Sequence, residues 1–241
     1  MWWQGEENAP EIVKMCLSSL RRNAASNRII LIDKNNYQEY LSLPPHILSK
    51  VASGCITLTH FSDIIRAGLL SKYGGLWIDA TIFAASRIPE EIFTAEYFTI
   101  KMVEDNFPKI LNPSLSRWTV FFFGAGRPGA KLFCFMYDIL SEYWKTHEGL
   151  IEYFIIDYVI ALAFDEFPDF REAWRHIPVN NTSWYKLVQC LNQEWDDAKF
   201  SEMCMTNQFF KLTYKKDFYR ETASGLQTFY GRLLSEYGIN S

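Results

Sequence analysis

Two charged residues have the type and spacing to act on a ligand. Asp63 and Arg66 stand three residues apart within residues 59–83, and this spacing on a helix places them on one face. A carboxylate accepts hydrogen bonds from hydroxyl groups, and a guanidinium donates them in a fixed fork, so the pair suits a polyol or an anion. The alternative is a surface salt bridge near the start of a helix, where an acid is favourable anyway.

Asp79 is a second candidate, because it follows the apolar residues Leu76, Trp77 and Ile78. An uncompensated buried carboxylate is costly, so an acid in such a run needs an explanation. At the carboxyl end of a parallel strand it would lie where ligands bind in open α/β sheets. Its oxygens suit a Mg²⁺ or Mn²⁺ ion that bridges a diphosphate. The alternative is an aspartate that caps the following turn.

Asp157 is a third candidate, since it interrupts an almost wholly apolar stretch expected to form a helix over residues 153–164. It is either a carboxylate paired inside the core, for example with an arginine or a tyrosine hydroxyl, or a group that orients or deprotonates an incoming hydroxyl. The residues by themselves favour neither reading.

The elements that position these residues alternate between helix and strand over the first 85 residues, which favours an α/β architecture with a mostly parallel sheet. The segment before Asp79 is expected to be a helix capped by Thr59 or Ser62, ended by Gly74 and Gly75, and followed by one strand. Apolar patterns predict strands over 28–33, 76–83 and 116–123, and helices over 11–23, 37–43, 130–147, 184–191 and 228–237.

Composition excludes several classes of protein. The 241 residues suit one domain, and a net charge of −4 does not draw the molecule to nucleic acid or to an anionic membrane. The five cysteines lack metal-site or disulfide-framework spacing and are expected to be reduced thiols. No apolar run approaches the ~20 residues of a membrane helix, and no secretory leader is recognised. We therefore expect a cytoplasmic protein.

The segment around Asp63 and Asp79 also resembles a known family. Its pattern Phe-Ser-Asp-x-x-Arg-x-x-x-Leu-x-x-Tyr-Gly-Gly-x-Trp-x-Asp-x-Thr is similar to the core signature of the DXD glycosyltransferases. These include bacterial capsular polysaccharide synthesis transferases, yeast initiating mannosyltransferases and clostridial glucosylating toxins. The opening Trp2-Trp3-Gln4-Gly5 resembles the capsular branch, where it follows the first strand; most of that strand is missing here, which suggests a trimmed N-terminus.

The resemblance is strong over residues 1–87, thinner through 119–178 and vague beyond. It implies a single GT-A domain over residues 1–241, Rossmann-like, with a mostly parallel central sheet flanked by helices and a more helical C-terminal part. Residues 1–115 would mainly bind the nucleotide sugar, and residues 116–241 would mainly bind the acceptor.

The same resemblance assigns roles to individual residues. Trp3 would stack on the nucleotide base, and Asp33 or Asn35 would hold the base or ribose. Ser62 would lie near the ribose, whereas Asp63 and Arg66 would grip hydroxyl groups of the donor sugar.

Further along the chain, Trp77 would line the donor pocket, and the helix carrying Asp157 would lie under the acceptor site. Asp79 matches the first acid of the DXD motif, which holds the cation, the ribose and the diphosphate. Thr81 stands where many relatives have a second acid that contacts the cation. The implied Mn²⁺ or Mg²⁺ would then be bound by Asp79 and Thr81 with help from the diphosphate, and no histidine follows His176 to serve as a C-terminal ligand.

The activity implied is transfer of a hexose from a nucleoside-diphosphate sugar, UDP in particular, to a saccharide or lipid-linked oligosaccharide, with retention of configuration. Such an enzyme would act at the inner face of the membrane, with peripheral association and no nucleic-acid partner. One alternative is a non-catalytic module that binds sugar nucleotides within a polysaccharide assembly complex. Another is a glycoside hydrolase with two carboxylates, which would leave Trp3, Ser62 and Arg66 without a role.

Overall fold

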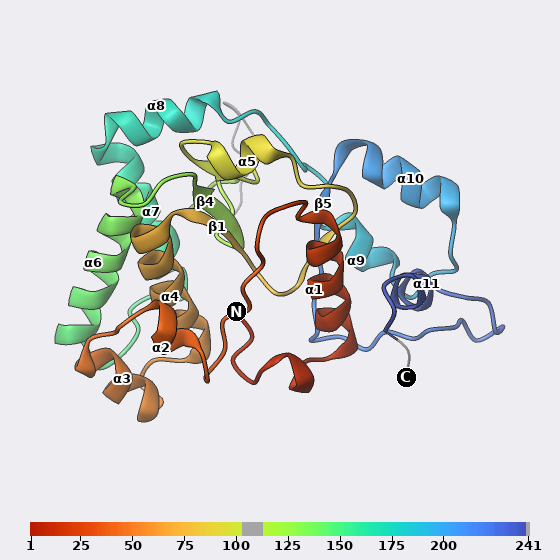
Figure 1. Ribbon diagram of the computed structural model, residues 1–241, viewed down its shortest axis with the longest axis horizontal. Helices are drawn as coiled ribbons and strands as arrows, with labels where there is room; N and C mark the ends of the chain where they lie inside the picture. The colour runs from red at the N-terminus through yellow and green to blue at the C-terminus, as the bar shows by residue number, and fades with distance from the viewer. Residues whose placement is uncertain (103–112, 240–241) are drawn as a thin grey trace. The chain divides into compact units, whose positions relative to one another are not determined.

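The computed structural model describes residues 1–102 and 113–239, which form a mixed α/β fold (Figure 1). The chain divides into two compact units. Unit 1 consists of Met1–Asp33, Asp79–Pro89 and the chain from Asn180 on; unit 2 consists of Lys34–Ile78 and the described parts of Glu90–Val179. Each unit is discontinuous in sequence. The single domain over residues 1–241, with its roles divided near residue 115, stays a prediction.

Unit 2 contains most of the helices and a three-stranded sheet. Its elements are α2 (Tyr37–Tyr40), α3 (Pro45–Ala52), α4 (Leu58–Tyr73), β1 (Gly75–Ile78), α5 (Glu90–Thr94), β3 (Phe98–Thr99), β4 (Phe122–Ala125), α6 (Lys131–Thr146), α7 (Ile155–Glu166) and α8 (Pro168–His176). The strand order is β1-β4-β3, and both pairings are antiparallel.

Gly124 lets the two longer strands of this sheet approach closely. It lies opposite Leu76 in the β1–β4 pairing. A Cβ atom at Gly124 would overlap the carbonyl oxygen of Gly75 and lie 2.8 Å from the Cα atom of Leu76. Both obstacles are backbone atoms that cannot turn aside, so the sheet in this form requires a glycine at position 124.

Helix α4 carries two of the candidate residues and packs against α6 (Figure 1). Its N-cap is Thr57, whose side-chain oxygen accepts from the backbone N–H of His60, and not Thr59 or Ser62 as expected. The helix ends where expected, at Gly74. Gly74 has a φ of 67°, a conformation that residues with a side chain rarely adopt.

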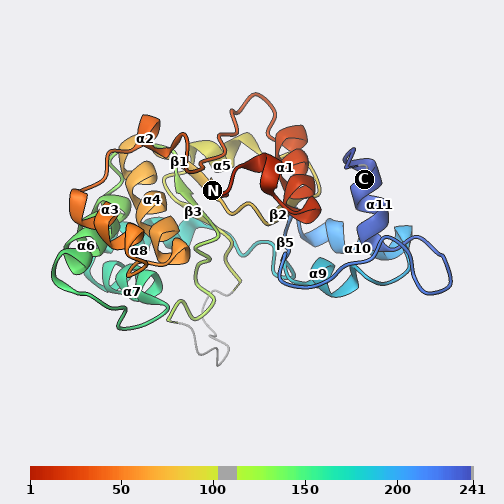
Figure 2. The ribbon, with the colours of Figure 1, turned by 90° about the horizontal axis from the view of Figure 1, so that it is seen from below.

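Unit 1 is a small layered structure around a two-stranded antiparallel sheet. It contains a 3₁₀-helix (Glu6–Asn8), α1 (Glu11–Asn23), β2 (Ile82–Ala84), α9 (Lys186–Cys190), α10 (Asp197–Thr206), β5 (Phe209–Lys211) and α11 (Phe229–Glu236). Strand β2 pairs with β5, so that Ile82 lies opposite Lys211 and Phe83 opposite Phe210. Helix α1 contacts β2, and α9 contacts β5 (Figure 2).

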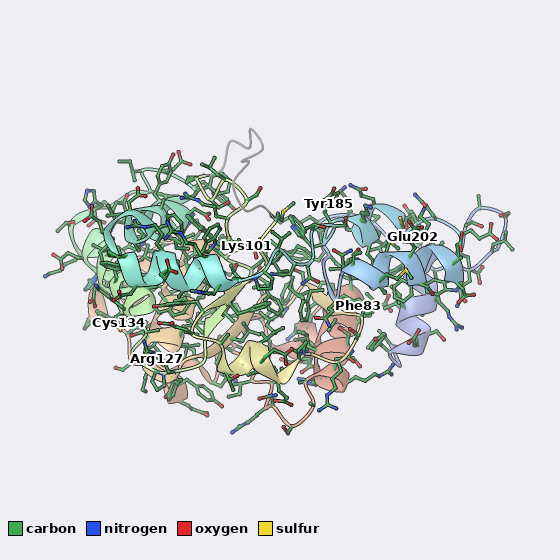
Figure 3. All side chains as sticks on the ribbon, turned by 90° about the horizontal axis from the view of Figure 1, so that it is seen from above. Phe83, Lys101, Arg127, Cys134, Tyr185 and Glu202 are labelled. Carbon is green, nitrogen blue, oxygen red and sulfur yellow. The ribbon has the colours of Figure 1, made fainter. Side chains whose placement is uncertain are left out.

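The core of unit 1 forms where α1 meets β2. Val13 and Cys16 on α1 are fully buried, as is Phe83, which is labelled in Figure 3. Burial of each large apolar side chain of this kind contributes about 1.5–3 kcal/mol. The hydroxyl of Ser19 accepts from the backbone N–H of Ala84 at 3.0 Å, which fixes the helix relative to the strand.

The structure confirms the expected helices more closely than the expected strands. The helix over 11–23 has the expected bounds, and helices lie within or near each of the other expected ranges. Residues 28–33 were expected to form a buried parallel strand, but they form none, and Ile30 is 41% exposed. The backbone N–H of Trp2 donates to the carbonyl oxygen of Ile32 at 2.9 Å.

The other expected strands are shorter than the apolar runs that suggested them. The expected strand over 76–83 is two strands, β1 and β2, that belong to different sheets and are separated by a turn at Ala80 and Thr81. The strand expected over 116–123 is β4, which begins only at Phe122. Every strand pairing among the described residues is antiparallel, which differs from the expected parallel sheet.

No helix in residues 1–102 or 113–239 combines the length and the apolar character needed to cross a bilayer.

Candidate functional site

The structure joins Asp63 and Arg66 in an ion pair on α4. A guanidinium nitrogen (Nη1) of Arg66 lies 3.1 Å from Oδ1 of Asp63, and the two side chains are only 5% and 9% exposed, respectively. The alternative of a surface salt bridge is therefore wrong. The face of α4 that carries them is covered, and their neighbours Ile64, Ile65 and Ala67 are fully buried.

Trp77 completes this cluster from the adjoining strand β1. The guanidinium carbon of Arg66 lies 5.0 Å from the centroid of the indole ring, within range of a cation–π interaction. Trp77 is itself buried and lies opposite Phe123 of β4. We call Asp63, Arg66 and Trp77 the α4 cluster. It combines a hydrogen-bond acceptor, a forked donor and a flat apolar surface, which together match the hydroxyl groups and the C–H face of a sugar.

Ser62 precedes this cluster on α4 and is partly exposed. Its expected place near the ribose stays a prediction.

Asp79 lies in unit 1, directly after β1, at the start of the turn that leads into β2. The backbone N–H of Ile82 donates to the carbonyl oxygen of Asp79 at 2.9 Å and closes this turn. The carboxylate forms an ion pair with Lys211 of β5, with 2.5 Å between Nζ and Oδ2. The side chain of Asp79 is 27% exposed and that of Lys211 is 25% exposed, so solvent reaches both.

Thr81 lies in the same turn and is buried. Its carbonyl oxygen accepts from the backbone N–H of Leu212 at 2.8 Å, which ties the turn to the residue after Lys211. We call Asp79, Thr81 and Lys211 the β2–β5 cluster.

The residues of the β2–β5 cluster do not fit a resident Mn²⁺ or Mg²⁺ ion. Such an ion prefers several hard oxygen ligands, with one or two carboxylates that are available to it among waters and substrate phosphates. Here one carboxylate is already paired with an ammonium group, and the second motif position supplies only the neutral hydroxyl of Thr81. Within residues 1–102 and 113–239, no group of three or more His, Cys, Asp or Glu side chains could hold a metal ion.

Asp157 lies on α7 in unit 2 and is 3% exposed. Its Oδ1 atom accepts from the indole N–H of Trp118 at 3.0 Å. The guanidinium carbon of Arg117 lies 4.4 Å from the centroid of the same indole ring. Burial lowers the pKa of Arg117, and the negative charge of Asp165 opposes this shift. Asp157 is thus a buried carboxylate that has the indole of Trp118 among its partners, and its role at the acceptor stays a prediction.

The residues assigned to the nucleotide lie near the start of the chain and in the segment after residue 32. Trp3 and Asp33 in unit 1 are partly exposed, and Asn35 in unit 2 is exposed. The neighbouring Trp2 packs in the unit 1 core, with its ring edge-on to Tyr214 at 5.0 Å between centroids. Packing is therefore a role of Trp2, while base stacking by Trp3 stays a prediction.

Sequence reasoning did not find Lys211. It is 132 residues from Asp79, in a segment where the resemblance is vague. The sequence does carry one local indication of this residue: Lys211 interrupts the apolar run formed by Phe209, Phe210 and Leu212. Because β5 pairs with β2, a charge at that position meets the turn that carries Asp79.

Comparison with curated proteins found no match, and comparison with solved structures also found none. A family model described as capsular polysaccharide synthesis protein matches residues 1–233. This match covers the α4 cluster, the β2–β5 cluster and Asp157, and the name of the family points to a part in making capsular polysaccharide. Since the matched region is nearly the whole chain, the protein belongs to the capsular polysaccharide synthesis protein family.

Proposed function

We propose that this protein is a glycosyltransferase that moves a hexose from a nucleoside-diphosphate sugar, with UDP as the nucleoside diphosphate, to a saccharide in capsular polysaccharide synthesis. The family supports the process, and the chemistry of the α4 cluster supports the reaction class. Transfer proceeds with retention of anomeric configuration, an expectation that rests on the resemblance to DXD glycosyltransferases.

The observation that carries the proposal is the buried pair of Asp63 and Arg66 beside Trp77. Taking two charges out of water is costly, and an apolar pair of similar size is often as stable or more stable. A fold therefore gains little from keeping this pair for stability alone. Sugar recognition gives it a role, because the carboxylate accepts from hydroxyl groups and the guanidinium donates to their oxygens.

The remaining roles follow the same reading. Trp3 stacks on the base, Asp33 or Asn35 holds the base or ribose, and Ser62 lies near the ribose. Asp157 orients or deprotonates the incoming acceptor hydroxyl.

Trp3→Ala should weaken binding of UDP by about 1–3 kcal/mol, because Trp3 is assigned to stacking on the base. Unchanged affinity for UDP in a folded variant would remove that assignment.

The assignment to the GT-A fold, with its Rossmann-like core, is also part of the proposal. It rests on the residues shared with DXD glycosyltransferases between Phe61 and Thr81. The described strands pair antiparallel, so the support for this fold comes from the motif.

The resemblance further implies Mn²⁺ or Mg²⁺ held by Asp79 and Thr81. Because Asp79 is paired with Lys211, the proposed function includes no step through a metal ion. The acceptor we propose is a saccharide or a lipid-linked oligosaccharide, met in the cytoplasm at the inner face of the membrane, where the protein would associate peripherally.

The experiment that tests the proposal measures turnover of the donor. The purified protein is incubated with UDP-hexoses, with and without capsular oligosaccharides, and released UDP is quantified. Transfer to water reports on donor activation even when the acceptor is not matched. Turnover of one or more UDP-hexoses, increased by an oligosaccharide acceptor, is the expected result; no turnover with any donor and acceptor would sink the proposal.

Two variants sharpen this test. Asp157→Asn keeps an oxygen that can accept from Trp118 but cannot take a proton, so it should lower transfer to the saccharide and leave UDP affinity unchanged. Arg175→Gln is the control, because Arg175 and Glu172 on α8 form an i,i+3 ion pair that is exposed, with 2.9 Å between its atoms. An exposed pair contributes little, so this variant should behave as wild type.

A non-catalytic module that binds sugar nucleotides is the second candidate, favoured by Thr81 at the position of the second acid. It predicts binding of UDP-hexose in calorimetry without release of UDP over hours. Turnover that is lost on changing Asp63 and Arg66 would exclude it.

A further inference from the structure

The ion pair between Asp79 and Lys211 puts a fixed positive charge beside the acid of the glycosyltransferase motif. The ammonium nitrogen lies 2.5 Å from a carboxylate oxygen, and about a quarter of each side chain is exposed. A lysine ammonium is a compact point charge with three N–H donors, and it binds phosphate groups well. Partial exposure lets the ammonium keep Asp79 as a partner and still donate to a ligand.

The backbone holds this pair in place from both sides. Lys211 ends β5 opposite Ile82, and the N–H of Leu212 donates to Thr81 at 2.8 Å. The N–H of Lys211 itself donates to the carbonyl oxygen of Trp184 at 3.0 Å. The turn from Asp79 to Ile82 is closed by its own hydrogen bond. The charged groups therefore extend from backbone that is hydrogen-bonded on both strands, as a preorganised anion site requires.

The cluster offers a diphosphate a cationic donor, whereas it offers a divalent cation only one carboxylate, which is already paired. Asp79 and Lys211 sum to zero, and Thr81 adds no charge. A divalent cation bound at Asp79 would be repelled by the ammonium beside it. A diphosphate would be attracted to that ammonium and repelled by the carboxylate, so it must lie closer to Lys211 than to Asp79. A second acid in place of Thr81 would leave the cluster negative and make it repel a diphosphate unless a metal were bound.

We propose that Lys211 binds the diphosphate of the nucleotide sugar, that Asp79 positions its ammonium, and that transfer proceeds without a divalent cation. This inference rests on the proposed function. In the transfer step, the bond between the anomeric carbon and the β-phosphate oxygen breaks, and its electron pair stays on that oxygen. The acceptor hydroxyl oxygen forms the new bond to the anomeric carbon, and its proton passes to Asp157 where that carboxylate acts as the base, or to the departing phosphate oxygen where Asp157 only orients the hydroxyl. Lys211 donates a hydrogen bond to the diphosphate and stabilises the charge that develops there.

Binding of UDP, measured by calorimetry in excess EDTA and again with Mn²⁺, tests this assignment. Wild-type protein should bind UDP in EDTA, and Mn²⁺ should change the affinity less than about threefold. Lys211→Gln should weaken UDP binding by roughly tenfold to a hundredfold, the range for lost hydrogen bonds to a charged group. Binding of uridine, which has no phosphate, should stay the same. Lys211→Arg should restore much of the affinity for UDP, because it keeps the charge.

Two further variants make the test sharper. Lys215→Ala, an exposed lysine on the same segment, should bind UDP as wild type does. Asp79→Asn should bind UDP no more weakly than wild type, since it removes a negative charge near the diphosphate, but its turnover should fall because the ammonium is less well positioned. If Asp79 holds a metal instead, Asp79→Asn loses the UDP affinity that Mn²⁺ adds.

The outcomes separate this inference from the proposed function. Turnover that requires Mn²⁺ and is unchanged in Lys211→Gln would overturn the inference and leave the glycosyltransferase in place. UDP binding that depends on Lys211 without turnover of any donor would support the anion site and overturn the proposed function. Absence of UDP binding under all conditions would overturn both.

Discussion

Asp63 and Arg66 are charged side chains on a helix whose neighbouring residues are buried and apolar. Their attraction at 3.1 Å offsets part of the cost of removing both from water, and the indole ring of Trp77 offsets a little more. A ligand hydroxyl would add hydrogen bonds that the pair cannot make by itself. A cluster that costs stability in this way is what we expect if its role is the sugar binding that we propose.

This reading predicts that function and stability separate when both charges are removed together. Asp63→Leu combined with Arg66→Met should keep the free energy of unfolding near that of wild type or raise it by about 1–4 kcal/mol. Turnover of the sugar nucleotide should fall at least about a hundredfold, since two sets of hydrogen bonds to charged groups are lost at roughly 1.5–3 kcal/mol each. Urea unfolding and UDP release measure the two quantities.

The single variant Arg66→Met is the necessary comparison. It removes the arginine of this ion pair and leaves the Asp63 carboxylate buried, which should cost about 3–5 kcal/mol of stability. A double variant that folds and keeps near wild-type turnover would show that the α4 cluster has only a structural role.

The sequence predicted that Asp63 and Arg66 of the α4 cluster share a helix face. It did not predict that Lys211 belongs to the β2–β5 cluster. Asp63 and Arg66 could be paired in advance because a helix brings residues three apart onto one face. Their burial could not, because it depends on which side of α4 the rest of unit 2 covers. Lys211 was out of reach for the same reason: its partner is 132 residues away, and only the β2–β5 pairing brings them together.

Among the elements, the expected helices were predicted more closely than the expected strands. The helix over residues 11–23 follows from its own apolar periodicity and from Pro10 before its first turn. A strand needs a neighbour, and nothing in residues 28–33 says whether one is present. The run from Leu76 to Phe83 carries no glycine or proline to mark the turn between β1 and β2, so it read as one strand.

The sheet of unit 2 gives a prediction at this scale. Gly124→Ala should lower the free energy of unfolding by roughly 1–3 kcal/mol, because the added methyl group meets backbone atoms of Gly75 and Leu76. Replacing glycine in a strand interior normally stabilises by about 0.5–1 kcal/mol, and here the steric overlap outweighs that gain. Chemical denaturation measures the change.

The control for this prediction is Gly149→Ala, since nothing lies within 4 Å of a Cβ atom added at that position. It should leave stability within about 0.5 kcal/mol of wild type. Because β1 carries Trp77, a displaced β1 should also lower UDP-hexose turnover in Gly124→Ala. Equal stability of the two glycine variants would mean that the β1–β4 spacing is not limited by Gly124.

For the molecule as a whole, the free energy of unfolding should depend on pH in the alkaline range, because a tyrosine of α11 is hydrogen-bonded to a glutamate of α1. The hydroxyl of Tyr230 donates to Glu11 at 3.2 Å. Burial, and then the negative charge of Glu11, raise the pKa of Tyr230 from 10.0 to about 12. Between these values the unfolded chain has released the proton and the folded protein still holds it, so stability is fully present below about pH 10 and is lost as the pH rises toward 12.

Tyr230→Phe removes this contribution, so its free energy of unfolding should fall less steeply between about pH 10 and 12 than that of wild type. Part of the decline should remain, because burial also raises the pKa of Tyr97, Tyr137 and Tyr237. Urea unfolding at a series of alkaline pH values gives both slopes, and identical slopes would contradict the assignment to Tyr230.

The discontinuity of unit 1 has a consequence for how a living cell makes this protein. A ribosome adds residues from the N-terminus, so β2 is synthesised long before β5, the strand that pairs with it. Until Phe210 has been synthesised, Phe83 of the nascent chain lacks the residue that pairs with it. During that time the unpaired edge of β2 is a site at which two unfinished chains can aggregate. Lys211 is likewise synthesised long after Asp79. The ion pair that we assign to the diphosphate therefore cannot form until nearly the whole chain has been made.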